Sequence, residues 1–153
     1  MMPAVSIRPL QRDDYAQWRP LWDGYNAFYG RVGETALAED ITRTTWERFF
    51  DPAEPVHAMV AAQGAAVVAL VHYLFHRSTT RLHDVCYLQD LFTTPAQRGR
   101  RIGRQLIEAV YAEARGAGSS RVYWLTQDAN VAGRALYDKV ARHAGFIVYA
   151  HEL

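Results

Sequence analysis

The sequence has little of several features that would assign it to a specialised class. It contains one cysteine, Cys86, in 153 residues, which excludes an internal disulfide and indicates a reducing compartment. Its 17 Lys and Arg residues nearly balance its 16 Asp and Glu residues, so the basic excess typical of nucleic-acid-binding domains is missing. The longest apolar run, 65–75, is too short to span a bilayer, and Arg8 and Arg12 precede any run resembling a signal peptide. We therefore expect a cytoplasmic protein with no nucleic-acid or membrane partner.

Metal and nucleotide fingerprints are also missing. His72 and His76 are four residues apart on a predicted strand, which separates them by about 13 Å and prevents them from sharing a metal ion. No other histidine spacing suggests zinc, and neither the G-x-G-x-x-G fingerprint nor the P-loop lysine motif occurs. We expect no metal site. His72 then has two interpretations, a residue on the face of the sheet or a neighbour of the substrate cleft.

The periodicity that is present predicts a single domain over residues 1–153 of mixed α/β (α+β) class. Half of the residues are hydrophobic, and the C-terminal half places helices after strands, which indicates a mixed sheet with helices on its faces. The predicted strands are 5–9, 56–62, 65–76, 85–93, 121–126 and 146–150. The predicted helices are 14–29, 35–50, 101–115 and 130–144.

Two stripes of side chains support these elements. One face of strand 65–76 is predicted to carry Val67, Ala69, Val71, Tyr73 and Phe75. One stripe of helix 14–29 is predicted to carry Trp18, Trp22, Tyr25 and Tyr29. We expect both stripes to pack in the core.

An arginine-rich stretch, TPAQRGRRIGRQL at 94–106, separates a predicted strand from a predicted helix. The first N–H groups of a helix are unpaired and, with the helix dipole, form an anion site. Gly99 and Gly103 allow a ligand to approach the backbone without a Cβ in the way. A solvated basic helix start is the alternative, and a nucleic-acid patch is disfavoured because no aromatic residues interleave the arginines. We interpret the stretch as a cradle for phosphates.

The cradle and a second motif together resemble the GNAT superfamily of N-acetyltransferases. The cradle, Arg98-Gly99-Arg100-Arg101-Ile102-Gly103, resembles the superfamily's Q/R-x-x-G-x-G/A loop. Arg101 stands at the middle glycine, where we expect helical backbone angles that permit arginine. Residues 130–137, NVAGRALY, resemble the N-x-x-A-x-x-L-Y helix with Gly133 for alanine, and Gly145-Phe146 resembles the closing G-F. Residues 87–93, YLQDLFT, look like the superfamily's central strand.

The resemblance implies a fold and an activity. The fold is a GNAT-type mixed, mostly antiparallel central sheet flanked by helices. The activity is acetyl transfer from acetyl-CoA to a primary amine of a small molecule (an amino acid or a polyamine) or of a lysine side chain, and the segments look closest to the histone/D-amino-acid and diamine (spermidine/spermine) acetyltransferase branches. A non-catalytic acyl-CoA sensor is the alternative. A homodimer through the C-terminal strand is also implied, since Phe146, Val148 and Tyr149 would invite pairing at a sheet edge.

The resemblance also implies roles for individual residues. Tyr137 would act as the general acid, because a tyrosine with a pKa near 10 keeps its proton at neutral pH. The region of the predicted helices 14–29 and 35–50 would border the acceptor, which makes Tyr25, Tyr29 and Arg31 substrate neighbours. The cofactor contacts would be Leu91, Phe92, Thr93, Arg98, Gly99, Arg100, Arg101, Ile102, Gly103, Arg104 and Asn130.

Two neighbouring residues are candidates for the general base. The diamine branch carries a glutamate where this sequence has Gln89, which cannot accept a proton, and Asp90 is adjacent. Neighbours on a regular strand face opposite sides, but the resemblance implies a bulge that would turn both toward the cleft. Deprotonating an alkyl amine at pH 7.4 costs about 4 kcal/mol, against about 0.7 kcal/mol for an α-amine. A protein without the glutamate therefore favours an α-amino substrate or a water-relayed base.

Overall fold

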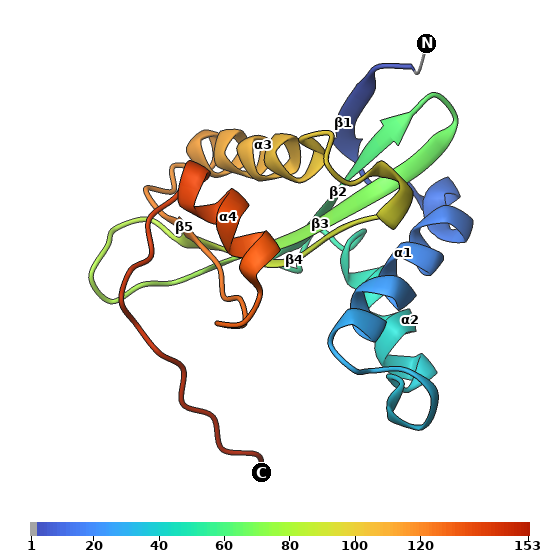
Figure 1. The fold of residues 1–153 in the computed structure, drawn as a ribbon. Coiled ribbons are helices and arrows are strands. Elements are labelled where there is room, and N and C mark those ends of the chain that lie inside the picture. The colour runs from blue at the N-terminus through green and yellow to red at the C-terminus, as the bar shows by residue number, and fades with distance from the viewer. Residues whose placement is uncertain (1–2) are drawn as a thin grey trace.

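The computed structural model describes residues 3–153, which form a five-stranded sheet with helices on both faces (Figure 1). The strand order is β1-β2-β3-β4-β5, and every neighbouring pair is antiparallel except β4 and β5. The strands are β1 (Val5–Pro9), β2 (Val56–Gln63), β3 (Ala66–His76), β4 (Val85–Thr93) and β5 (Val122–Tyr123). The helices are α1 (Tyr15–Phe28), α2 (Glu39–Arg48), α3 (Ile102–Gly116) and α4 (Val131–Val140). The mixed, mostly antiparallel sheet confirms the predicted fold class.

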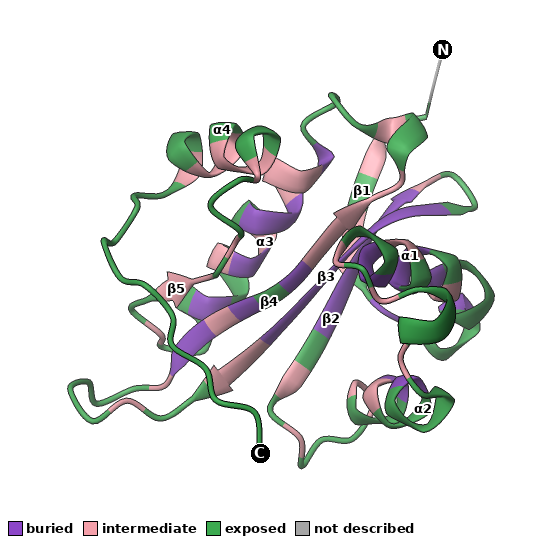
Figure 2. Cartoon of the chain, turned by 60° about the horizontal axis from the view of Figure 1, so that its bottom comes forward, coloured by how far each residue is buried: buried purple, intermediate pink, exposed green. Residues whose placement is uncertain are grey.

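Each face of the sheet has its own apolar core. Helices α1 and α2 cover one face, where Trp18, Trp22 and Trp46 pack on Leu70 of β3. Helix α3 covers the other face, and α4 lies beside it and packs against the same cluster. Figure 2 shows the burial concentrated on β2, β3, β4 and the sheet-facing side of α3. Each large apolar side chain buried in this way contributes about 1.5–3 kcal/mol, so the two cores hold the helices on the sheet.

A bulge in β3 changes the predicted face of one residue. Ala61 pairs with Ala69 whereas Ala62 pairs with Val67, so Val68 is an extra residue on β3. Because one extra residue reverses the alternation of side chains, Val67 packs in the α1 core and Ala69 packs in the α3 core. The prediction that Val67 shares a face with the other members of its stripe was therefore wrong. Ala69, Val71, Tyr73 and Phe75 do share the α3 face.

A second bulge lies on β4. His72 pairs with Asp90 whereas Tyr73 pairs with Leu88, which leaves Gln89 as the extra residue. Leu88 before the bulge and Leu91 after it both pack in the α3 core. Gln89 and Asp90 are thereby both turned toward the α1 side, as the resemblance implied.

The C-terminal part of the chain has less regular structure than predicted. Strand 121–126 is reduced to Val122–Tyr123, and helix 130–144 ends at Val140, whose carbonyl accepts a hydrogen bond from the Tyr111 hydroxyl at 2.8 Å. Residues 141–153 form neither helix nor strand and extend away from the domain (Figure 1). The predicted strand 146–150 was wrong for this chain, because a strand needs a paired neighbour and this segment has none within residues 3–153.

The N-terminal helices follow the predictions more closely. Helix α1 matches its predicted range to within one residue at each end. Helix α2 begins at Glu39 and not near Thr35, because Gly33–Thr35 form a separate 3₁₀ turn. Within residues 3–153, no helix combines the length and the apolar character that crossing a membrane requires.

Candidate active site

The cradle joins the end of β4 to the first turn of α3. The chain leaves Thr93, passes through a short 3₁₀ turn (Pro95–Gln97), and enters α3 at Ile102. Gly99 has φ +81°, and a Cβ added to it would meet no atom within 4 Å. Glycine is therefore suited to this position by its left-handed backbone and not by lack of space. The N–H groups in the first turn of α3 have no acceptor within the helix. They point outward from the helix start, where they can bind an anion.

Arg101 corrects an expectation. Its φ of 63° and ψ of 19° are left-handed, and it is the one non-glycine residue with positive φ in the described chain. The predicted helical conformation at this position was wrong. The turn demands the conformation that glycine adopts freely, and an L-residue held there costs roughly 1–2 kcal/mol.

A cavity of about 630 Å³ brings the cradle together with other predicted residues. Its walls come from the end of α1, the last residues of β4, the cradle and one face of α4. Of the predicted site residues it contains Tyr25, Tyr29, Leu91, Phe92, Thr93, Arg98, Gly99, Arg101, Ile102, Gly103, Arg104, Asn130 and Tyr137. Arg100 does not line this cavity, although it belongs to the same loop.

The β4 wall presents an open strand edge. One edge of β4 pairs with β3 as far as Thr93, but the other edge pairs with β5 only at Cys86 and Tyr87. Within residues 3–153, Leu91–Thr93 therefore have no strand on the cavity side. Unpaired strand edges bind extended ligands through backbone N–H and C=O groups.

The α4 wall begins with a capped helix. Asn130 is the N-cap of α4: its Oδ1 accepts from the Gly133 N–H at 3.2 Å, and its Nδ2 donates to Thr126 Oγ1 at 3.0 Å. A Cβ at position 133 would lie 2.4 Å from Asn130 Nδ2. Glycine at this position therefore leaves the Asn130 amide room to fold over the helix start.

Tyr137 projects from α4 and is shared by two cavities. Its ring packs edge-on against Trp124 at 5.5 Å. Burial, and secondarily Tyr29, raises the pKa of the Tyr137 hydroxyl. No hydrogen bond to this hydroxyl forms within the described residues, so its proton is available to a ligand.

The end of α1 and the residues after it bring an arginine onto two tyrosines of the cavity wall. The Arg31 guanidinium lies over the rings of Tyr25 and Tyr29, at 5.9 Å and 5.5 Å from their centres. Its Nε donates to Asn26 Oδ1 at 2.6 Å, which ties the loop after α1 to the helix. Arg31 does not itself line the cavity.

Gln89, Asp90 and His72 border a separate cavity of about 170 Å³. Burial and the neighbouring Asp90 carboxylate raise the pKa of both Tyr25 and Tyr29, and the positive charge of Arg31 opposes this effect more weakly. Because Tyr29 also acts on Tyr137, it lies in electrostatic contact with both the predicted acid and the predicted base. Tyr25 and Tyr29 thus line the cradle cavity and lie near Asp90, which borders the smaller one.

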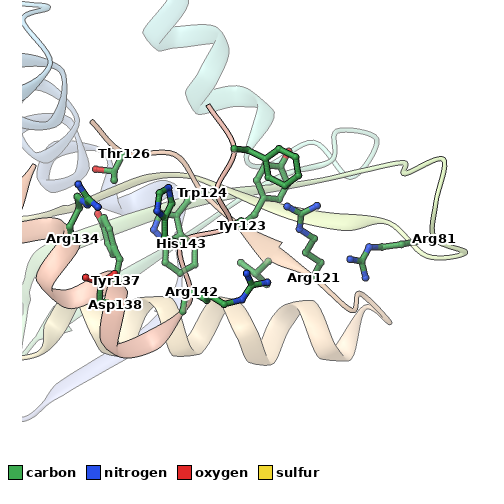
Figure 3. Close-up of a pocket in the computed structure, with 14 residues that line it drawn as sticks. Arg81, Arg121, Tyr123, Trp124, Thr126, Arg134, Tyr137, Asp138, Arg142 and His143 are labelled. Atoms are coloured by element: carbon green, nitrogen blue, oxygen red, sulfur yellow. The ribbon is translucent and has the colours of Figure 1, made fainter. Parts of the chain in front are cut away.

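A third cavity, of about 520 Å³, lies between β5 and α4 (Figure 3). Four arginines reach it, and the labelled side chains come from β5, from α4, from the residues that flank these elements and, for Arg81, from the loop between β3 and β4. The arginines are Arg81, Arg121, Arg134 and Arg142. Tyr137 forms the boundary between this cavity and the cradle cavity.

Several residues of the site escaped prediction from sequence. Gln97 lines the cradle cavity, and its Oε1 is buried without a hydrogen-bond partner among residues 3–153. Phe28 and Leu136 also line the cavity. Leu136 had a usable signal, since it precedes Tyr137 in the recognised helix motif, whereas Gln97 and Phe28 had none. No group of three or more metal-ligating side chains occurs in the described chain.

Comparison with known proteins finds matches along most of the chain. The model of the Acetyltransferase (GNAT) family matches residues 16–141. The D-amino-acid N-acetyltransferase HPA3 of Saccharomyces cerevisiae is 30% identical over 147 residues, which cover 95% of this chain and 89% of that protein.

Solved structures share the fold at lower identity. The aminoglycoside acetyltransferase AAC(6')-Iy, solved with the bisubstrate analogue CoA-S-monomethyl-acetylneamine, superposes with a TM-score of 0.82 at 15% identity, covering 98% of this chain and 99% of that one. A ribosomal-protein-alanine N-acetyltransferase of Brucella melitensis biovar Abortus 2308 gives a TM-score of 0.74 at 19% identity, covering 98% and 100%. At these identities the similarity concerns the fold alone.

Proposed function

Because the chain belongs to the acetyltransferase (GNAT) family, we propose that it moves the acetyl group of acetyl-CoA to a primary amine in the cytoplasm. The acceptor is a small molecule (an amino acid or a polyamine) or a lysine side chain. The observation that carries this proposal is the cradle cavity, in which a helix N-terminus, an open strand edge and a tyrosine with an available hydroxyl share one space of about 630 Å³.

The residues present suit acetyl-CoA. Arg98, Arg101 and Arg104 and the first N–H groups of α3 suit a pyrophosphate. Leu91–Thr93 suit an extended, amide-containing arm at the open edge of β4. The buried Gln97 Oε1 can accept a hydrogen bond from an N–H or O–H group of the ligand. When bound, acetyl-CoA supplies an acetyl group activated as a thioester.

The chain's own groups then have distinct tasks. A backbone N–H at Leu91 or Phe92 stabilises negative charge at the acetyl carbonyl oxygen, an interaction that in other enzymes is worth a factor of about 10²–10³. The Tyr137 hydroxyl holds a proton, and its raised pKa keeps that proton in place at neutral pH until a stronger base takes it. Asp90, turned toward the α1 side by the bulge at Gln89, is the one carboxylate of β4 and receives the proton of the amine.

Among the acceptors, the α-amine of an amino acid is favoured. The relative HPA3 is a D-amino-acid N-acetyltransferase. Releasing the proton of an α-amine at pH 7.4 costs about 0.7 kcal/mol against about 4 kcal/mol for an alkyl amine. A single aspartate therefore suffices more readily for the first class. The uncommitted N–H donors of Arg31, beside Tyr25 and Tyr29, suit a carboxylate on the acceptor.

Thiol release from acetyl-CoA in the presence of a panel of amines tests the proposed function. The panel compares D- and L-amino acids, polyamines and lysine-bearing peptides, with calorimetric binding of CoA and acetyl-CoA measured in parallel. We expect binding of both cofactor forms and turnover with at least one amine class. Binding without turnover would favour a non-catalytic acyl-CoA sensor, an alternative that the glutamine at position 89 supports. Absence of binding would contradict both.

We also propose that the protein works as a homodimer through its C-terminal segment. Phe146, Ile147, Val148 and Tyr149 are between 65% and 89% exposed, an unusual concentration of apolar surface in consecutive residues. The cavity of Figure 3 follows the unpaired side of β5 and backs onto Tyr137. A second copy that laid its apolar segment there would bury that surface and close the wall behind Tyr137.

Sedimentation of the wild type and of Val148→Asp tests this assembly. We expect the wild type to sediment at about twice the 17.4 kDa of one chain at micromolar concentration, and the variant to sediment as a monomer. Ala65→Asp, in the exposed turn between β2 and β3, is the control and should remain dimeric. A monomeric wild type would contradict the proposed homodimer.

A further inference from the structure

Three buried side chains on the α1 face form a hydrogen-bonded chain that ends at Asp90. The indole Nε1–H of Trp18 donates to His72 Nε2 at 3.1 Å, and His72 Nδ1 contacts Asp90 Oδ2 at 2.8 Å. The three residues are 0%, 2% and 8% exposed. They come from α1, β3 and β4, so the chain crosses from a helix to the strand that carries the bulge.

Trp18 decides which imidazole nitrogen carries the proton. An indole N–H is a donor only, so His72 Nε2 must be the bare acceptor. The proton of the neutral ring is then on Nδ1, which donates to the Asp90 carboxylate. The lone pair of Nε2 is thus engaged by the Trp18 N–H. His72 therefore acts as a donor to Asp90 and not as a base in its own right.

The surroundings hold this arrangement in one orientation. The imidazole ring lies 4.5 Å from the Phe49 ring and 5.4 Å from the Trp22 ring, between α1 and the end of α2. The extra residue at Gln89 places Asp90 opposite His72 in the register of the sheet. Oδ2 is held by His72, while the Tyr25 hydroxyl donates to the neighbouring Gln89 carbonyl at 3.4 Å. The second carboxylate oxygen of Asp90 is therefore left for a ligand in the small cavity that Asp90 borders.

We propose that His72 is a positioning residue for Asp90, and that Trp18 fixes the tautomer in which it works. This inference rests on the proposed function, in which Asp90 receives the proton of the acceptor amine. A carboxylate with one oxygen restrained presents the other in a constant direction, which favours proton transfer in the geometry that the reaction needs. His72 touches neither substrate in this role, and its effect passes through Asp90.

The proposal is tested with matched amide variants of His72. The side-chain nitrogen of His72→Asn overlays Nδ1 and can still donate to Asp90, whereas the longer side chain of His72→Gln directs its amide toward Trp18. We expect His72→Gln to lower kcat by about tenfold to a hundredfold, with the KM for acetyl-CoA unchanged, and His72→Asn to remain within a few-fold of the wild type. Melting temperatures of both variants show whether a lower kcat comes only from lower stability.

A second measurement does not depend on activity. Nitrogen-15 NMR of the histidine rings in the wild type should show a protonated Nδ1 and a bare Nε2 for His72, and Trp18→Phe should disturb that pattern. A proton on Nε2 in the wild type, or equal kcat values for the two amide variants, would overturn the proposal. Full turnover by Asp90→Asn would overturn it while leaving the acetyltransferase activity intact. Absence of turnover by the wild type would instead overturn the proposed function.

Discussion

The Tyr137 hydroxyl combines burial with the absence of a protein hydrogen bond in the described chain, and this separates a catalytic role from a structural one. Tyr137→Phe removes no intramolecular hydrogen bond, so the free energy of unfolding should change by less than about 0.5 kcal/mol. If the hydroxyl is the general acid, kcat should fall by roughly 10²–10⁴ while binding of acetyl-CoA is retained. Steady-state kinetics beside a melting curve measure both. A fully active variant would remove Tyr137 from the mechanism.

Arg101 is held in a conformation that glycine would adopt without strain. In Arg101→Gly, relief of about 1–2 kcal/mol outweighs the 0.5–1 kcal/mol that glycine's extra freedom costs the folded state. We expect a melting temperature higher by about 2–4 °C, together with weaker binding of acetyl-CoA that is most evident at low salt.

Arg100→Gly is the matched control for this substitution. It removes the same charge from the same loop, but the φ of residue 100 is not positive. It should therefore bring no gain in stability. A melting temperature that rises equally in both variants would show that charge repulsion among the arginines, and not backbone strain, limits the stability of the loop.

At this scale the sequence predicted which residues gather in the cavity better than it predicted their conformation. The two sequence motifs identified Arg98, Asn130 and Tyr137, because each motif fixes the position of these residues in a loop or a helix. The left-handed angles of Arg101 were not visible, since arginine gives no indication of positive φ. The bond from Trp18 to His72 was equally hidden, because it joins residues 54 positions apart.

At the scale of elements, the start of α4 sets two effects of glycine against each other. Gly133→Ala should gain about 1 kcal/mol of helix propensity. The new Cβ, 2.4 Å from Asn130 Nδ2, should displace the cap and lose about 1 kcal/mol. We expect a melting temperature close to that of the wild type, but a raised KM for acetyl-CoA because Asn130 leaves its place in the cavity wall.

Gly116→Ala, at the end of α3, provides the comparison. Its Cβ would meet no atom within 4 Å, so the propensity gain should appear undiminished as greater stability. The KM for acetyl-CoA should not change. Stabilisation of both variants by the same amount would indicate that the Asn130 cap contributes little.

The junction between β1 and α1 makes stability depend on acidic pH. Arg8 donates to both carboxylate oxygens of buried Asp14, at 2.7 Å and 2.9 Å, and the Gln11 N–H donates to the same group at 2.8 Å. The bonds from Arg8 hold the pKa of Asp14 below its usual value, and the Gln11 bond adds to this. Because the folded pKa is the lower one, the stabilisation is complete above the unfolded value of about 3.9 and is lost as the pH falls through the folded pKa.

Melting curves between pH 6 and pH 2.5 check this dependence. The wild type should lose stability more steeply than Asp14→Asn, which has no proton to gain at this position. The two proteins should differ most near neutral pH and approach each other at the acidic end. Parallel curves over the whole range would show that this ion pair contributes nothing to acid sensitivity.

The bounds of elements with strong periodicity were predicted to within a residue or so. The bounds of elements with few contacts to the core were not. Strand β4 has its predicted bounds, because apolar residues fill the core on one side and turn signals stop it on both ends. Strand β5 was overestimated, since its apolar run continues after the β4 partner has bent away at the bulge. Helix α4 was overestimated because periodicity alone does not register where contact with the core ends, which is at Val140.

For the whole molecule, Cys86 reports on global opening. Its side chain is fully buried in the α3 core, and burial raises the pKa of the thiol to about 12. A thiol reagent should therefore label the protein only through unfolding, at a rate that increases with denaturant in step with the loss of structure. The variant Cys86→Ala has no cysteine and gives the background rate of labelling. Rapid labelling without denaturant would mean that the α3 core opens locally.

The arrangement of the whole molecule was predictable as a class but not in its detail. Alternating helices and strands indicated a mixed sheet covered on both faces, and motif order indicated which strand borders the cofactor. The three cavities could not be predicted, because each is bounded by elements distant in sequence. The course of residues 141–153 was not predictable either, since an apolar segment gives no sign of whether its partner belongs to the same chain.

Because Gln89 is one extra residue in β4, the residue numbers that face α3 change from even to odd along the strand. Before it, even-numbered side chains face α3; after it, odd-numbered ones do, as Leu88 and Leu91 illustrate. Because Gln89 has no partner on β3, deleting it would leave Leu88 and Asp90 opposite Tyr73 and His72 as before, with Asp90 still on the α1 side and Leu91 still in the α3 core. The strand thus carries one residue more than its pairing needs, and homologous sequences with a gap at this position would be expected to keep the aspartate in place and to retain the reaction.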